Sequence, residues 1–412
     1  IKILQNLLLC LCFDKNSFPI KYLNEAKFLE KAFKAAVKTN LNHQILKDTN
    51  TILKIGFVSG DFYNHPVGFF LESVLENLTN HPVELFAYSC NHHQDDLTQK
   101  IKPYFKAWHD ITSLSDSNSA KLILSDQIHI LIDLSGHTAN NRLSLFAFKP
   151  APIQISWLGY FASTGMDFID YFIADKTSVT PETENYFCEK IAYLPDTRLC
   201  FTPPAFNLEI SALPAINNTY ITFGCFQGLS KINDEMLNLW LQILNQVPNS
   251  ILIIKNHQLN DNQVRTNLTD KLVSLGFNHK QFILEGGSSR KEYLQRYSAI
   301  DILLDTFPYP GGTTTCEALW MGVPTLTLSG KTLLERQGES ILINADLKKW
   351  VAYTKEEYID KAITFSQEID YLSWIRKNLR DTLPNTPIMN AKVFALNFYN
   401  LLTSLWLNYD KK

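Results

Sequence analysis

The stretch from Asp305 to Glu317 contains the residue types of an anion-binding turn. It reads Asp-Thr-Phe-Pro-Tyr-Pro-Gly-Gly-Thr-Thr-Thr-Cys-Glu and follows an apolar run that predicts a buried strand. The threonines open a predicted helix, where free backbone N–H groups and the positive end of the helix dipole attract anions. Gly311 and Gly312 allow the backbone to approach a ligand closely. We expect a diphosphate here. An ordinary Thr-capped helix is the alternative, because neither a dinucleotide-binding glycine fingerprint nor a P-loop occurs.

Three further residues that could do chemistry each follow a predicted strand. Lys231, six residues after Cys225, could neutralise phosphate charge, with a solvated Lys as the alternative. His65 follows the first strand and could act as a base or bind a sugar hydroxyl. His137 follows another strand of the same half. A single loop His is often incidental, but two at strand carboxyl ends of one half favour a shared site.

The sequence does not support a metal centre. Asp-x-Asp does not occur, and His92-His93 beside Asp95-Asp96 lacks metal-ligand spacing, so we expect a surface loop there. The seven cysteines include no CxxC pair, which is typical of reduced thiols in a cytoplasmic protein. We therefore expect no metal, no cofactor and a cytoplasmic location.

The elements that must position these residues alternate between strand and helix, which predicts two mostly parallel sheets. The alternation stops over 195–214 and then restarts, so two α/β halves joined near residue 210 are expected, with a ligand site in the cleft between them. Strands are predicted at 52–58, 83–88, 128–134, 153–158, 171–174, 192–194, 221–225, 250–255, 282–284, 302–305 and 325–328. Helices are predicted at 70–78, 119–126, 234–246, 263–275, 291–299 and 315–321, and again from Lys355 onward.

Four segments follow from this pattern. They are a helical segment over 1–45, a first Rossmann-like domain over 50–208, a second over 209–385 and a C-terminal helix over 386–412. The apolar run Leu7–Phe13 is interpreted as a buried helix rather than a signal-peptide core, because only Lys2 supplies a basic flank and no small-residue cleavage site follows. The first residue is Ile, so we expect further sequence upstream.

Composition excludes several classes of protein. The formal net charge of −3 over 412 residues argues against a broadly basic nucleic-acid binder. Hydrophobic residues at 45% and charged residues at 19% are ordinary for a globular protein. No apolar run approaches the roughly 18 residues of a membrane span, so no membrane partner is expected.

Taken together, the motifs resemble the catalytic region of the O-GlcNAc transferase/SPINDLY family. The resemblance covers roughly 50–385, and residues 1–45 resemble the end of the tetratricopeptide array that precedes this region in the family. The matching stretches are Lys54–Phe62 with His65-Pro66, Asp133–Thr138, Pro150–Gln154, Trp157–Tyr160, Phe226–Ile232, Asp305–Glu317 and Met321–Pro324.

The resemblance implies a fold of the GT-B type and an inverting glycosyltransferase that works without a metal. Such an enzyme moves a sugar from a nucleotide donor to Ser or Thr of intracellular proteins. His65 would lie at the reaction centre, and Lys231 would hold the diphosphate and stabilise the leaving nucleotide. His137 is the third catalytic candidate. We expect His65 to position the substrates while deprotonation uses another route; His65 as general base is the alternative.

The resemblance also assigns donor contacts. Thr313 and Thr314 would bind phosphate, Glu317 the ribose hydroxyls, and Leu158 and Gly159 would line the sugar pocket. The remaining predicted donor contacts are Arg290 and Tyr293 near the base, together with Gln227, Ser288, Tyr309, Gly311 and Gly312.

Departures from the family pattern bear on the donor. Animal O-GlcNAc transferases have His at the position of Gly312, Asp at that of Glu317 and Cys at that of Tyr309. Plant SPINDLY, which uses GDP-fucose, has Glu at the ribose position and a Thr-rich loop. UDP-GlcNAc is the expected donor, and GDP-fucose, a UDP-hexose or a non-catalytic scaffold are the alternatives. Partners are expected to be a nucleotide sugar and protein acceptors, with oligomer contacts in the missing upstream repeats.

Overall fold

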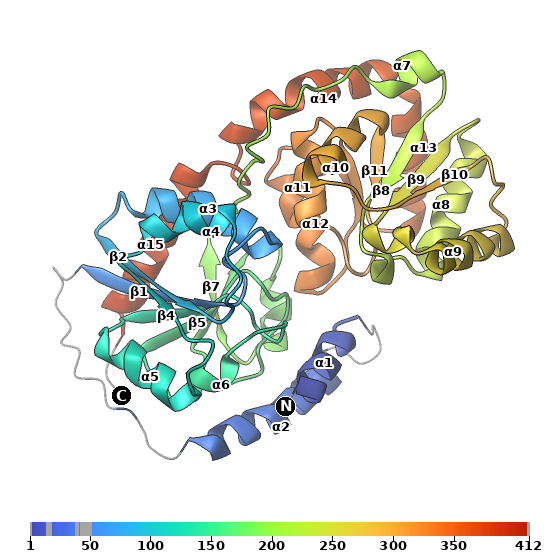
Figure 1. The fold of residues 1–412 in the computed structure, drawn as a ribbon. Helices are drawn as coiled ribbons and strands as arrows, with labels where there is room; N and C mark the ends of the chain where they lie inside the picture. Colours follow the sequence, from blue (N-terminus) through green and yellow to red (C-terminus); the bar gives the residue numbers. More distant parts are fainter. Residues whose placement is uncertain (1, 14–18, 38–40, 42–51, 410–412) are drawn as a thin grey trace. The chain divides into compact units, whose positions relative to one another are not determined.

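The computed structural model describes residues 2–13, 19–37, 41 and 52–409 (Figure 1). The chain divides into two compact units. Unit 1 contains Ile1–Thr202 and Asn390–Lys412, and unit 2 contains Pro203–Met389. The predicted boundary at 208/209 thus differs from the structural one by six residues. The C-terminal segment is not a separate body, because it returns to unit 1.

Unit 1 contains a seven-stranded parallel sheet in the order β3-β2-β1-β4-β5-β6-β7. Its strands are β1 (Leu53–Ser59), β2 (Val83–Ser89), β3 (Ala107–Asp110), β4 (Ile130–Asp133), β5 (Ile153–Ser156), β6 (Tyr171–Asp175) and β7 (Lys190–Leu194). Its helices are α1 (Lys2–Leu11), α2 (Ile20–Ala36), α3 (Pro66–Leu78), α4 (Asp96–Ile101), α5 (Asp116–Ser125), α6 (Leu143–Phe146) and α15 (Ala391–Leu407).

Unit 2 repeats this arrangement with six parallel strands in the order β10-β9-β8-β11-β12-β13. Its strands are β8 (Thr222–Cys225), β9 (Ile251–Lys255), β10 (Phe282–Glu285), β11 (Ile302–Leu304), β12 (Thr325–Leu328) and β13 (Val351–Ala352). Its helices are α7 (Pro214–Asn218), α8 (Asp234–Gln246), α9 (Asn262–Leu275), α10 (Arg290–Arg296), α11 (Thr313–Trp320), α12 (Leu333–Ile343), α13 (Lys355–Gln367) and α14 (Ile369–Thr382). The two Rossmann-like α/β halves predicted from the sequence are confirmed.

Each sheet has one point where the strand order reverses. In unit 1 it lies between β1 and β4, and in unit 2 between β8 and β11. The loops that leave the carboxyl ends of these neighbouring strands diverge there and leave room for a ligand. His65 and His137 follow the first pair of strands, and Lys231 and the Asp305–Glu317 stretch follow the second.

The N-terminal helices α1 and α2 pack on unit 1 through one buried stripe. Leu8 and Leu11 of α1 and Tyr22 and Leu29 of α2 are 0–5% exposed and belong to the same apolar cluster as β4 and the loops after β5. The helix predicted over the apolar run Leu7–Phe13 is therefore present as far as Leu11, with Leu8 and Leu11 buried and Leu7 and Phe13 exposed. Gly165 is required in that contact, because a Cβ there would lie 2.3 Å from the Cβ of Ala26.

The C-terminal helix α15 closes the other side of unit 1, where it contacts α3 and β7. Its Phe398 ring lies 4.6 Å from the ring of Trp157, and its Trp406 ring lies 4.5 Å from that of His129. A segment some 200 residues away in sequence therefore completes this core. Figure 1 shows the red α15 beside the light-blue α3.

Two strands were missed by the sequence prediction. β3 is an edge strand whose Ala-Trp-His-Asp sequence has no apolar run, and β13 has only two residues. Their sheet pairing with β2 and β12 is set by tertiary neighbours rather than by local pattern.

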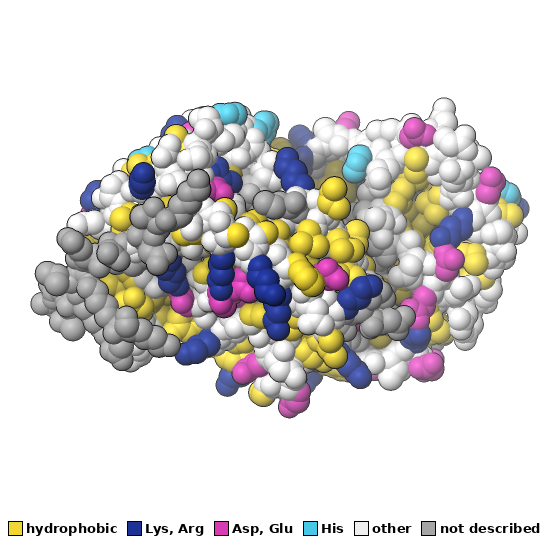
Figure 2. All heavy atoms as spheres, turned by 90° about the horizontal axis from the view of Figure 1, so that it is seen from below, with side chains coloured by type: hydrophobic (Ala, Val, Ile, Leu, Met, Phe, Trp, Pro, Cys, Tyr) yellow, Lys and Arg dark blue, Asp and Glu magenta, His cyan; other side chains and the backbone are white. Residues whose placement is uncertain are grey.

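The surface is mixed in charge. Figure 2 shows Lys and Arg side chains interspersed with Asp and Glu on the face seen from below, with hydrophobic side chains between them. Exposed hydrophobic side chains include Ile3 and Ile20 of the N-terminal helices, at 86% and 74% exposure. Across the described residues, no helix combines the length and apolar character that a membrane span requires.

Candidate functional site

The turn after β11 is organised by the buried carboxylate of Asp305. It accepts hydrogen bonds from the backbone N–H of Thr306 at 2.9 Å and of Gly311 at 2.7 Å. It also accepts from Thr327 Oγ1 at 2.9 Å and from Gln227 Nε2 at 3.2 Å. Burial raises the pKa of Asp305 to about 6, although these hydrogen bonds favour the ionised form and oppose the shift. The bonds hold the turn of unit 2 against the loop after β8.

Helix α11 begins on this turn without a side-chain cap. Its N-cap residue is Gly312, which has no side-chain acceptor for the first backbone N–H groups. The hydroxyl oxygens of Thr313 and Thr315 are buried, and neither has a hydrogen-bond partner among the described residues. A Cβ at Gly311 would lie 2.2 Å from Gln227 Nε2, so only Gly fits this close approach. The helix start therefore presents unused donors, as an anion site requires.

Lys231 directs its ammonium at the same turn. It ends the short 3₁₀ helix η3 (Leu229–Lys231), and its Nζ donates to the Pro310 carbonyl at 3.1 Å. The Nζ also lies 3.5 Å from Gln227 Oε1 and 3.6 Å from the ring centroid of Tyr309. Burial lowers the pKa of Lys231 to about 8, although the Asp305 charge opposes the shift. Lys231, Gln227 and Tyr309 are thus brought together with the α11 start.

A second polar group lies further along α11. Glu317 is buried, and its Oε1 lies 2.6 Å from Arg290 Nη2 at the start of α10. Burial raises the pKa of Glu317, while the Arg290 charge lowers it. The Tyr293 hydroxyl meets the Tyr297 hydroxyl at 3.0 Å, which donates to the Thr314 carbonyl at 3.2 Å. The residues predicted to contact the base and the ribose therefore lie together around α10 and α11 of unit 2.

Ser288 lies apart from this group. It is exposed in the loop between β10 and α10, two residues before Arg290. No hydrogen bond joins it to the predicted donor residues within the described part of the chain.

His65 caps helix α3 in unit 1. Its Nδ1 accepts from the Val67 backbone N–H at 3.3 Å and lies 3.8 Å from Asp61 Oδ2. The side chain is 37% exposed, so part of the ring reaches the surface. Burial lowers the pKa of His65, and the Asp61 charge opposes that shift. In the capped form the neutral ring carries its proton on Nε2, where it can donate to a ligand.

His137 has a different environment from His65. It is 2% exposed, and its Nε2 donates to the Thr164 carbonyl at 2.8 Å. Burial lowers its pKa to about 4, so the ring is neutral at pH 7. Its Nδ1 is buried without a hydrogen-bond partner in the described part of the chain. The ring lies at the predicted strand edge but faces the interior of unit 1.

Leu158 and Gly159 follow β5 at the same edge. Leu158 has a φ of +75°, and a Cβ on Gly159 would lie 1.9 Å from the Leu134 carbonyl oxygen. The segment after β5 therefore presses directly on the loop that carries His137. Its backbone conformation, rather than its side chains, defines this part of the surface.

The residues that organise the loop after β4 were not singled out from the sequence. The buried Asp133 accepts from the backbone N–H of Ser135 at 3.1 Å and of Gly136 at 2.8 Å, and from Ser156 Oγ at 3.2 Å. Burial raises its pKa to about 6. Asp133 and Asp305 thus occupy equivalent places in the two units. An Asp that ends an apolar strand before a Ser/Thr or Gly turn is the signal that could have found both.

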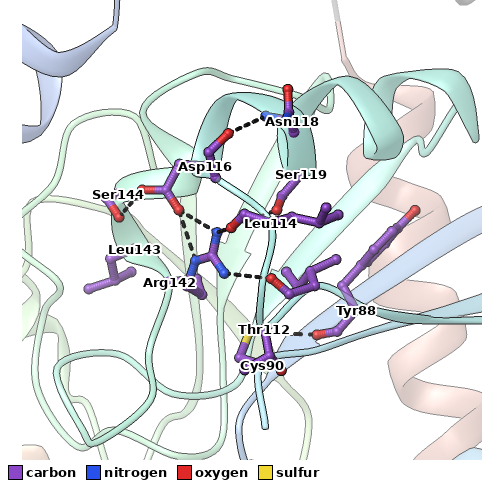
Figure 3. A network of polar contacts seen from close by, with 12 residues as sticks. Tyr88, Cys90, Thr112, Leu114, Asp116, Asn118, Ser119, Arg142, Leu143 and Ser144 are labelled. Carbon is purple, nitrogen blue, oxygen red and sulfur yellow. Dashed lines mark hydrogen bonds and ion pairs between the residues drawn. The ribbon is translucent and has the colours of Figure 1, made fainter. Parts of the chain in front are cut away.

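Arg142 ties the loop after β4 to the loop after β3 (Figure 3). Its Nε donates to Asp116 Oδ1 at 2.8 Å, and its Nη1 and Nη2 donate to the carbonyls of Ile111 and Leu114 at 2.9 and 3.0 Å. The Ser144 hydroxyl donates to the other oxygen of Asp116 at 2.5 Å. This network fixes the strand edge that carries His137.

The described residues contain no group of three or more His, Cys, Asp or Glu side chains able to hold a metal ion. His92 and His93 are exposed and pair with Asp110 and Asp95, at 2.8 and 3.9 Å respectively.

Of the two parallel α/β units, unit 2 thus carries an uncapped helix start and a Lys at the carboxyl edge of its sheet. The profile of glycosyl transferase family 41 matches residues 25–201 and 211–398. The chain belongs to this family, and its two Rossmann-like halves are of the GT-B fold class.

Named relatives and solved structures agree with this assignment. The chain is 35% identical over 371 residues to the protein of Arabidopsis thaliana named "Probable UDP-N-acetylglucosamine–peptide N-acetylglucosaminyltransferase SPINDLY", covering 89% of this chain. It is 28% identical to the SEC protein of the same plant, covering 86% of this chain and 37% of that protein. A mutant of the Thermobaculum terrenum O-GlcNAc transferase aligns with a TM-score of 0.91 at 31% identity, over 98% of this chain and 77% of that chain.

The chain spans only 41% of the length of the Arabidopsis SPINDLY protein. Anabaena HepE, solved with UDP and glucose, matches at a TM-score of 0.53 and 11% identity over 86% of this chain and 100% of that one, a likeness of fold alone.

Proposed function

We propose that this chain is an inverting, metal-independent glycosyltransferase that moves N-acetylglucosamine from UDP-GlcNAc to Ser or Thr of proteins. The observation that carries the proposal is the uncapped start of α11 beside the Lys231 ammonium. A diphosphate needs both N–H donors and positive charge, and here the protein supplies both. The names of the SPINDLY and SEC relatives, which are peptide N-acetylglucosaminyltransferases, support the transfer to protein, and the name of the Thermobaculum O-GlcNAc transferase supports the sugar.

On the donor side, the unused hydroxyl of Thr313 and the N–H groups of Thr313 and Thr314 bind the diphosphate, and Lys231 stabilises the charge that develops on the leaving nucleotide. Glu317 accepts from the ribose hydroxyls, which requires it to share its carboxylate with Arg290. Tyr293 stacks on the base. Gln227, Tyr309, Gly311 and Gly312 shape the turn around the phosphates and sugar, and Ser288 adds a rim contact.

On the acceptor side, His65 contacts the hydroxyl that attacks the sugar. Of the two histidines, His65 is the one whose ring reaches the surface. Leu158 and Gly159 line the sugar pocket through backbone. His137 holds the loop after β4 through its bond to Thr164, and its contribution to the reaction is through that loop.

GDP-fucose is the second candidate donor. The observation that favours it is the ring of Tyr309, which lies against Lys231 where animal O-GlcNAc transferases have a small Cys. A bulkier side chain beside the predicted N-acetyl pocket disfavours an N-acetyl sugar, by an amount on the order of 1–3 kcal/mol.

Partners and location follow from the same proposal. The acceptors are intracellular proteins, and the location is cytoplasmic, supported by seven free cysteines, four of them buried. Nucleic acid and membrane are not proposed as partners.

The test is a donor panel on the purified chain. Thermal unfolding is followed with UDP, GDP, UDP-GlcNAc, UDP-glucose and GDP-fucose, with Lys231→Ala as the control protein. A ligand at a hundred times its dissociation constant stabilises by about 2.7 kcal/mol. We expect UDP and UDP-GlcNAc to raise the melting temperature of the wild type and not of Lys231→Ala. A shift with GDP and GDP-fucose alone selects GDP-fucose as the donor. The absence of a shift with every nucleotide contradicts the proposal that the chain is a glycosyltransferase.

A further inference from the structure

Asp61 is a buried carboxylate directly behind His65. It follows the carboxyl end of β1, is 6% exposed, and its backbone N–H donates to Ser59 Oγ at 2.9 Å. Its Oδ2 lies 3.8 Å from His65 Nδ1, and the Tyr63 hydroxyl is its other polar contact. In the described residues, His65 is the one ion-pair partner of Asp61. A buried carboxylate without Lys or Arg nearby is costly unless something uses its charge.

The Nδ1 atom of His65 has two partners within reach, and they require different forms of the ring. The Val67 backbone N–H, at 3.3 Å, requires a bare Nδ1 and leaves the proton on Nε2. The Asp61 carboxylate, at 3.8 Å, requires a proton on Nδ1 and leaves a lone pair on Nε2. The two distances differ by half an ångström. To exchange one partner for the other, the ring must move slightly, lose its Nε2 proton to water and take up a proton on Nδ1, and its 37% exposure gives water access to it.

We propose that Asp61 is the positioning residue that gives His65 its proton-accepting form at the surface. The proposal rests on the proposed function, in which His65 contacts the acceptor hydroxyl. It assigns deprotonation to His65, in place of the purely positioning role expected from the sequence. The free protein holds the ring on the helix cap, and the Asp61 contact forms when the acceptor hydroxyl meets Nε2.

The electrostatics around the pair fit this role. Burial raises the pKa of Asp61 and lowers that of His65, and each charge opposes the shift of the other. A proton that arrives on His65 is therefore stabilised by Asp61. The other titratable groups at this loop are Tyr63 and Asp95. The Tyr63 ring is tilted against that of His65 at 5.5 Å and meets that of His93 edge to face at 4.9 Å, and Asp95 lies 3.9 Å from His93.

The step balances with the substrates already proposed. The acceptor hydroxyl oxygen forms a bond to the anomeric carbon, and the bond from that carbon to the diphosphate oxygen breaks. The electron pair of that bond leaves with the nucleotide diphosphate. The hydroxyl proton moves to Nε2 of His65, and the resulting imidazolium keeps its other proton directed at the ionised Asp61.

The test replaces Asp61 with its uncharged isostere. In Asp61→Asn we expect the titration midpoint of His65, followed by NMR of its ring protons, to fall by about one pH unit, because the nearby negative charge is lost. We expect kcat to fall by about a hundredfold with the KM for UDP-GlcNAc unchanged, as for loss of general base catalysis. The matched control is Asp95→Asn, which makes the same change in the neighbouring loop and keeps an Asn cap on α4; it should leave both values unchanged.

The outcomes separate this proposal from the proposed function. An unchanged His65 titration in Asp61→Asn overturns the pairing whether or not the chain transfers a sugar. A lowered midpoint with wild-type kcat overturns the catalytic role of Asp61. If the wild type is inactive but Asp61→Asn still lowers the titration midpoint of His65, the proposed function is overturned and the pairing of Asp61 with His65 still stands.

A measurement on the wild type covers the case in which Asp61→Asn does not fold. Because the two groups interact, the His65 ring protons should report a second, smaller step at lower pH, where Asp61 takes up its proton. Tyr63→Phe, which alters a half-exposed side chain and leaves both charges, should keep that second step. A single-step titration of His65 in the wild type overturns the proposal.

Discussion

At the scale of single residues, the charge on Lys231 is set by its surroundings. The Tyr309 ring and the turn shield the ammonium from water, and the Pro310 carbonyl and Gln227 Oε1 accept hydrogen bonds from it. Its pKa of about 8 leaves it mostly charged at pH 7 and neutral above pH 9. A diphosphate would restore the charge, since opposite charge favours the protonated amine.

Binding of UDP should therefore weaken as the pH rises. The free protein loses the Lys231 proton above about pH 8, and binding must then take a proton up. We expect the affinity for UDP to fall about tenfold between pH 7.5 and pH 9, measured by calorimetry. Lys231→Arg remains charged throughout and should give a flat profile. The same decline in Lys231→Arg would show that another group is responsible.

At the scale of elements, each strand edge is built from a turn that only certain residues permit. The Asp305 turn needs Gly at 311, because any side chain there would meet Gln227 Nε2 and Thr315 Oγ1 at 2.2 and 2.5 Å. The start of α3 needs a capping side chain, which His65 supplies through Nδ1. Local sequence selects each turn, and the turn then places the helix start.

Gly311→Ala should abolish UDP binding in the thermal-shift assay. The new methyl group displaces Gln227 from the turn and costs about 1–3 kcal/mol of stability through overpacking. Gly228→Ala is the matched control, because a Cβ there meets only Ser230 Oγ, at 3.8 Å, and its φ of −59° suits Ala. Retained UDP binding in Gly311→Ala would mean that this turn does not bind the phosphates.

The cap on α3 can be separated from the chemistry of His65. His65→Ala should lose about 1 kcal/mol of stability, because the Val67 N–H loses its acceptor. His65→Asn keeps a good capping side chain and should remain close to the wild type in urea unfolding. Both variants should lose the transferase activity. If His65→Asn were as unstable as His65→Ala, the ring would be stabilising unit 1 by packing and not by capping.

At the scale of the whole molecule, unit 1 depends on both ends of the chain. Helices α1 and α2 bury Tyr22, whose hydroxyl meets that of Tyr160 at 3.1 Å, and α15 buries Phe398 against Trp157. The His65 and His137 loops thus rest on a core that the first and last segments complete. Removal of either end would expose apolar surface of unit 1.

Phe398→Ala should destabilise unit 1 by about 3–5 kcal/mol, because the ring is fully buried. Amide hydrogen exchange should show the loss in β1, β4 and β5 and leave the protection of unit 2 unchanged. Leu396→Ala, on the same helix but 44% exposed, should change stability by less than about 0.5 kcal/mol. Equal loss of protection in both units would mean that they unfold as one.

The sequence by itself determined the class of fold, most strand positions and the turn that precedes the helix start at Thr313; phosphate binding by that turn stays a prediction. Apolar runs of four to seven residues that end in Gly, Asp or Ser predict buried parallel strands without knowledge of their neighbours in space. The Gly-Gly-Thr-Thr run likewise predicts a helix start. The edge strand β3 and the two-residue β13 lacked such a pattern, because neighbouring strands define them.

Only the tertiary structure decided which polar residues meet. It turned His137 inward to Thr164, left His65 at the surface, and placed Asp61 and Asp305 behind His65 and the α11 start. It also returned α15 to unit 1 after the whole of unit 2. These contacts and pKa shifts depend on hydrogen bonds and packing between residues that are far apart in the sequence. A local sequence pattern does not predict such partners.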